Sequence, residues 1–87
     1  MSDAIRAVVQ KVIQNGKHGA FAVALSDEMT GTITFSLNEE VWSETSYPET
    51  GMYVILSSLR KKRSGWRALN GRFLMPSDEQ QPAKRKQ

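Results

Sequence analysis

Residues 31–37 have the sequence GTITFSL, and this stretch decides the fold class. From residue 32 to residue 37 every second side chain is apolar, and the side chains between them carry hydroxyl groups. Successive side chains of a β-strand point to opposite faces, so the alternation predicts a strand with one buried and one solvated face. Thr30 and Gly31 mark the turn that opens it.

Four further segments have strand-like composition and are separated by turn signals such as Asn15-Gly16 and Ser64-Gly65. They are residues 5–13, 20–25, 52–58 and 66–74. Together the five segments predict an all-β fold, a small five-stranded barrel over residues 1–75. A long loop separates the third strand from the fourth, and one short helical turn is expected near Trp42. The dipeptide Asn70-Gly71 inside the last segment is expected to mark a bulge or a bend.

The first segment also fits a helix. Its apolar residues Ile5, Val8, Val9, Val12 and Ile13 follow helical spacing, and they are five of the nine residues from 5 to 13. All five are β-branched, which favours a strand. The helical alternative would place an N-terminal helix beside a smaller barrel, the layout of Sm-like proteins.

The composition excludes several classes of protein. The chain has 87 residues and no cysteine, so it forms one domain without a disulfide framework or a thiolate metal site. No apolar run approaches the roughly 20 residues that span a bilayer, and the N-terminus lacks the apolar core of a signal peptide. A cytoplasmic location is therefore expected. Residues 76–87 contain one alanine as their only apolar residue apart from proline, which predicts a flexible basic tail.

Charge is distributed unevenly along the chain, whose formal net charge is +3. Acidic residues dominate before residue 50, and cations follow. The run from residue 60 to residue 67 combines consecutive cations with a tryptophan in a predicted hairpin, a pattern that suits a nucleic-acid backbone. The candidate phosphate contacts are Arg60, Lys61, Lys62, Arg63, Arg67 and Arg72. The candidate stacking residues are Phe21, Tyr53 and Trp66.

Three stretches, residues 8–13, 19–23 and 31–37, resemble OB-fold RNA-binding domains, most closely the repeat of ribosomal protein S-one. Cold-shock domains are similar in strand spacing and size. The resemblance implies an OB-type barrel that binds RNA or single-stranded DNA, with Phe21 facing the bases. Thr34 stands where the S-one repeat has a base-contacting histidine, and Ala20 and Ala22 replace the cold-shock aromatics. The resemblance therefore implies that the protein contacts the backbone of the nucleic acid more than it recognises the bases.

Alternatives remain open at each of these positions. The basic hairpin could be a solvated loop that protects a sheet edge, and Phe21 or Trp66 could be core residues. The loop around Trp42 and Tyr47 could bind a protein, which would make the barrel an accessory subunit of a larger complex, although Trp42 is more simply explained as a cap on the barrel end. His18 has no metal-binding or catalytic neighbours in the sequence, so no enzyme activity, metal or cofactor is expected.

Overall fold

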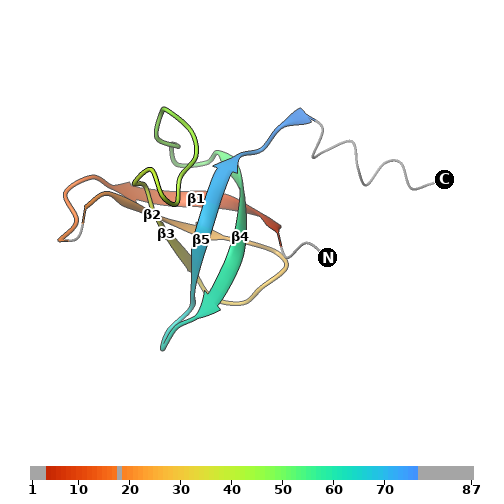
Figure 1. Ribbon diagram of the computed structural model, residues 1–87. Coiled ribbons are helices and arrows are strands. Elements are labelled where there is room, and N and C mark those ends of the chain that lie inside the picture. Colours follow the sequence, from red (N-terminus) through yellow and green to blue (C-terminus); the bar gives the residue numbers. More distant parts are fainter. Residues whose placement is uncertain (1–3, 18, 77–87) are drawn as a thin grey trace.

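The computed structural model describes residues 4–17 and 19–76. These residues form five strands and no helix, as Figure 1 shows. The strands are β1 (Ile5–Ile13), β2 (Phe21–Leu25), β3 (Ile33–Ser36), β4 (Tyr53–Lys61) and β5 (Trp66–Phe73). The predictions of an all-β fold and of a strand in residues 5–13 are confirmed. His18 and nearly all of the predicted tail, residues 77–87, lie outside the described residues.

The strands close into a barrel in the order β1-β2-β3-β5-β4, after which β4 returns to β1. All neighbouring strands are antiparallel except β3 and β5, which are parallel. This is the five-stranded barrel of the OB type that the sequence predicts. Because the barrel is closed, each of its five strands is paired with a neighbour on both sides along part of its length.

Strand β1 contains a β-bulge that explains why its sequence also fits a helix. The register with β2 shifts between Val9 and Lys11, which leaves Gln10 as the extra residue. Ala7 and Val9 are therefore buried, Gln10 and Lys11 are both exposed, and Val12 packs against the core again. Two outward residues in succession turn the alternation of a strand into a spacing that resembles a helix. The bulge also lets β1 curve, so that it pairs with β4 at its start and with β2 at its end.

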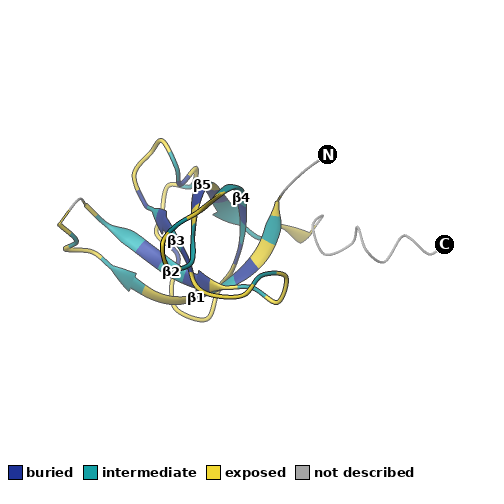
Figure 2. Ribbon diagram, turned by 90° about the horizontal axis from the view of Figure 1, so that it is seen from below, coloured by how far each residue is buried: buried dark blue, intermediate teal, exposed yellow. Residues whose placement is uncertain are grey.

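The interior combines small side chains from some strands with large ones from others. Strands β2 and β5 contribute buried alanines, β1 contributes both an alanine and a valine, and β3 and β4 contribute larger apolar side chains. Small and large residues on facing strands fill the tapered interior of a small barrel. In Figure 2 the buried positions lie along the strands, and the loops are mostly exposed. The largest fully buried side chains are Phe35, Ile33, Leu56, Val9 and Val54.

Trp42 closes one end of the barrel, as the sequence predicts. A single turn leads into Trp42, and the backbone N–H of Trp42 closes it by donating to the Asn38 carbonyl at 2.9 Å. The side chain is 2% exposed, and its ring centroid lies 5.7 Å from that of Phe35 and 5.0 Å from that of Phe73. The indole Nε1 donates to the backbone oxygen of Ser46 at 2.8 Å. Its polar atom is thus satisfied inside the core.

The predicted bulge at Asn70-Gly71 is wrong. Strand β5 pairs with β4 in one continuous register through both residues. Gly71 is needed for a different reason, because a Cβ there would lie 3.0 Å from the Leu56 Cδ2 atom and 3.1 Å from the Trp42 Cε3 atom. The glycine makes room for the tryptophan that caps the barrel.

Replacing this glycine should therefore destabilise the domain by overpacking. We expect Gly71→Ala to lower the free energy of unfolding by roughly 1–3 kcal/mol, measured by urea denaturation. In a Trp42→Phe background the same substitution should cost less, because the part of the ring that the new methyl group meets is gone. An equal cost in both backgrounds would contradict this account of Gly71.

Candidate nucleic-acid interface

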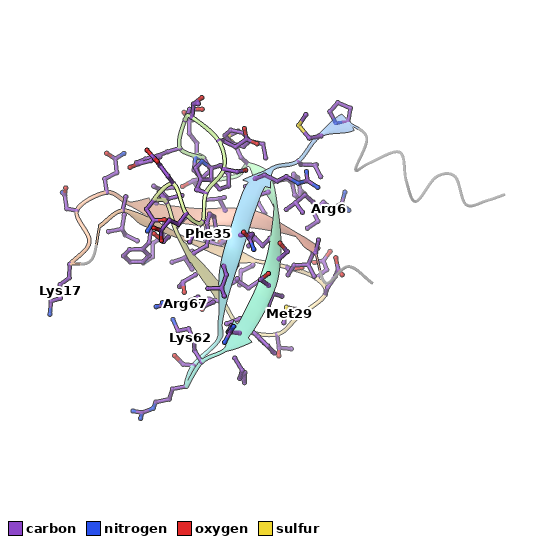
Figure 3. All side chains as sticks on the ribbon, viewed as in Figure 1. Arg6, Lys17, Met29, Phe35, Lys62 and Arg67 are labelled. Atoms are coloured by element: carbon purple, nitrogen blue, oxygen red, sulfur yellow. The ribbon has the colours of Figure 1, made fainter. Side chains whose placement is uncertain are left out.

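A groove of about 490 Å³ lies over the outer face of β2, β3 and β5. It runs between the turn that joins β1 to β2 and the hairpin that joins β4 to β5. Lys17 lines it from the turn, Lys62 from the hairpin and Arg67 from β5. Figure 3 shows Lys62 and Arg67 together on one side, with Lys17 at the tip of the opposite turn. Of the described residues that line the groove, none is Asp or Glu.

The strand registers place cations at both ends of a row that crosses the barrel surface. Lys11 on β1 lies opposite Val23 on β2, and Val23 lies opposite Thr34 on β3. Thr34 is next to Arg67 on β5, which lies opposite Arg60 on β4. Paired residues of neighbouring strands share a face, so these side chains form one outward row. The row passes through all five strands of the closed barrel, so it runs around the barrel, over four strand-to-strand steps or roughly 19 Å along the curved surface.

The side chains of the consecutive cations in the β4–β5 hairpin do not all face the same surface. Arg60 shares the outward face with Arg67. Lys61 lies over the ring of Trp66, with its Nζ 5.1 Å from the ring centroid. Lys62 folds back over β3, where its Nζ donates to the Thr34 Oγ1 atom at 3.2 Å. Only part of the charge predicted to act together therefore faces the groove.

The hairpin turn depends on Gly65. The Lys62 backbone N–H donates to the Gly65 carbonyl at 2.9 Å, which closes the turn. Gly65 has φ +91°, a left-handed conformation that favours glycine, and a Cβ there would lie 2.6 Å from the backbone oxygen of Thr32. That oxygen also accepts from the Trp66 N–H at 2.9 Å, so the turn lies directly against the start of β3. This contact holds Lys62 over the groove.

Phe21 supplies the aromatic surface. It is the first residue of β2, it is half-buried, and it lines the groove. Its ring packs against Gly16 in the preceding turn, where a Cβ would lie 2.9 Å from the Phe21 Cε1 atom. Phe35 also borders the groove but is 1% exposed. Of the described lining residues, Phe21 is thus the one aromatic side chain that is not part of the buried core.

The neutral polar side chains of the groove already accept hydrogen bonds within the protein. Thr34 accepts from Lys62, and its hydroxyl donates to the Trp66 carbonyl at 3.4 Å. Ser36 Oγ accepts from the Asn38 N–H at 3.2 Å. Asn38 Oδ1 accepts from two backbone N–H groups of the next turn, at 2.9 and 3.2 Å. The groove therefore presents mainly donors, from lysine, arginine and amide groups, to a ligand.

The other predicted site residues lie outside the groove. Tyr53 is 53% exposed but begins β4, roughly 25 Å along that strand from Lys61, and the Arg6 guanidinium lies 5.6 Å from its ring centroid. Arg72, near the end of β5, lies opposite Ile55. Arg63 is exposed in the hairpin turn. Trp66 packs against the core from the barrel end, opposite Lys61.

Two cations, Lys17 in the groove and Lys11 at the end of the outward row, were missed by sequence reasoning. Both lie far along the chain from the basic hairpin. The resemblance to OB-fold proteins contains the signal that points to Lys17, because the loop between the first two strands of these barrels commonly contacts ligands. Lys11 could be recognised only once the bulge at Gln10 was known to turn it outward.

No family model, curated protein or solved structure matches this chain. Within the described residues there is no helix long and apolar enough to cross a membrane. The same residues contain no group of three or more histidine and acidic side chains placed to hold a metal ion.

The role of Gly65 in holding the hairpin against β3 can be tested by substitution. We expect Gly65→Ala to lower the free energy of unfolding by about 1–2 kcal/mol or more, because alanine is strained at this φ and its methyl group meets the Thr32 carbonyl. Ser64→Ala, at the neighbouring exposed turn position, should leave the melting temperature unchanged within error. Equal melting temperatures for the two variants in a thermal scan would contradict this structure of the turn.

Proposed function

We propose that this protein is a single-stranded nucleic-acid-binding module, which binds RNA or single-stranded DNA in the groove over β2, β3 and β5. One observation carries the proposal: cations from three separate parts of the chain, Lys17, Lys62 and Arg67, line one groove together with Phe21. OB barrels bind oligonucleotides on the face of strands 2 and 3, between the same two loops. The resemblance to the S-one repeat and to cold-shock domains favours the same ligand.

Electrostatics favours a polyanion in this groove. Its charged lining residues, Lys17, Lys62 and Arg67, are all cationic among those described. The acidic loop between β3 and β4 is at the opposite end of β5 from the basic hairpin (Figure 1), and its residues Asn38 and Val41, on either side of Glu39 and Glu40, line the groove at that end. A strand in the groove would therefore approach positive charge at Lys17 and at the hairpin end, and its phosphates would release counterions there.

The same groove has little capacity to distinguish bases. One ring, that of Phe21, is available for stacking, and every base has a face that can stack on it. The hydroxyl and amide oxygens of the groove already accept hydrogen bonds, so the donor groups of a base find few open acceptors. Binding should thus depend on the phosphate backbone more than on sequence.

Charge removal inside the groove should weaken binding and its dependence on salt. We expect the double variant Lys62→Gln, Arg67→Gln to lose roughly tenfold or more in affinity for a labelled single-stranded oligomer at low salt, by fluorescence anisotropy. The slope of log K against log salt concentration should fall by about 0.7 for each phosphate contact removed. Arg6→Gln is the matched control, because Arg6 lies opposite Ile55 on β4, outside the groove.

The proposal fails if the wild-type protein does not bind at low salt, or if its binding is indifferent to salt. The alternative function would then be protein binding by the barrel. A protein partner could not contact the side chain of Trp42, because that side chain is buried. Tyr47, which is 47% exposed, would stay available to such a partner.

The aromatic contact can be tested separately from charge. We expect Phe21→Leu to weaken binding by about 1–3 kcal/mol, because leucine keeps the apolar packing on Gly16 but loses the ring that stacks on a base. Tyr53→Leu should bind like the wild type, since Tyr53 lies at the far end of β4. If Tyr53→Leu weakens binding and Phe21→Leu does not, the ligand occupies another face.

A further inference from the structure

Arg60 and Arg67 lie directly opposite each other in the antiparallel ladder of β4 and β5. Side chains at opposite positions share a face, and their Cβ atoms are about 5 Å apart. Both residues are exposed. Like charges directly opposite each other destabilise a sheet unless something of opposite charge lies between them.

Among the described residues, the surroundings of the pair supply no such charge. Arg67 has Thr34 as its neighbour on β3, and the residues two positions along the strands include Lys62 and Leu69. In the part of the chain that the structure describes, neither guanidinium has a hydrogen-bond or carboxylate partner. Two neighbouring cations do have partners within the protein, because Lys61 lies over the ring of Trp66 and Lys62 donates to Thr34.

We propose that Arg60 and Arg67 together form the binding site for one phosphate group, held between the two guanidinium forks. Planar guanidinium groups bind phosphate oxygens through pairs of parallel hydrogen bonds, and an anion between them removes the repulsion across the ladder. Arg67 also lines the groove, so the site lies at the rim where a bound strand would leave it. Binding of a phosphodiester of a nucleic acid at this site rests on the proposed function. The same pair of guanidinium groups could also bind a free phosphate monoester.

This phosphate site predicts that replacing Arg60 raises the thermal stability of the protein but lowers its affinity for an oligonucleotide. Arg60→Gln removes the repulsion, so in phosphate-free buffer this variant should melt roughly 2 °C or more above the wild type. The same variant should bind an unphosphorylated thymidine oligomer of about 12 nucleotides several-fold more weakly. A merely structural arginine would not give both effects.

The experiment compares thermal melting of the wild type, Arg60→Gln and Arg6→Gln while inorganic phosphate is titrated at constant ionic strength. Phosphate should raise the melting temperature of the wild type and of Arg6→Gln more than that of Arg60→Gln, because only the first two retain the paired guanidinium groups. Arg6→Gln controls for the loss of one positive charge and for the general stabilisation of proteins by phosphate. Equal rises in all three proteins would overturn the phosphate site.

Titration with the oligomer separates this proposal from the proposed function. If the oligomer binds and Arg60→Gln binds it as tightly as the wild type, the phosphate site is wrong and the nucleic-acid groove stands. If phosphate selectively stabilises the proteins that retain the pair but the oligomer does not bind, the site takes a phosphate monoester and the proposed function is wrong.

Discussion

The parallel pairing of β3 with β5 closes the barrel, and the rest of the structure depends on it. Residues 33–35 and 66–68 are distant in the chain, yet their backbones share one ladder, extended by the bond from the Trp66 N–H to the Thr32 carbonyl. Without this pair, β3 and β5 would each present an unsatisfied edge. The same pair places Thr34 beside Arg67, so the closure that completes the fold also forms the floor of the groove.

Closure also determines how the ends of the barrel are filled. Five short strands enclose a narrow interior, and one tryptophan from the long loop is enough to seal one end. Trp42 reaches that position because Gly71 leaves room for its ring and because Ser46 accepts the indole hydrogen bond. A segment that looks like an irregular connection is therefore part of the core, and its acidic residues remain near the end of β5 that lies away from the basic hairpin.

Much of the fold could be predicted from the sequence, because its signals are local. The alternation in residues 31–37 predicted β3, and turn glycines such as Gly65 separated the strands. The bulge at Gln10 gave the sequence of β1 a spacing that also fits a helix. A bulge cannot be recognised from the sequence, because the extra residue is defined only by its lack of a partner on the neighbouring strand. Gly71 was misjudged for a similar reason. Its role comes from Trp42, which is 29 positions earlier in the chain.

For the site, the sequence by itself determined that the hairpin after residue 59 is strongly basic and that Phe21 lies in a strand. Only the tertiary structure decided which cations lie on the same surface. It directed Lys61 to Trp66 and Lys62 to the groove, it added Lys17 from another turn, and it set Arg60 against Arg67. The physical reason is that charge and strand propensity are properties of neighbouring residues, whereas a shared face depends on strand register. Register is settled by the packing of the closed barrel, through contacts between residues far apart in the chain.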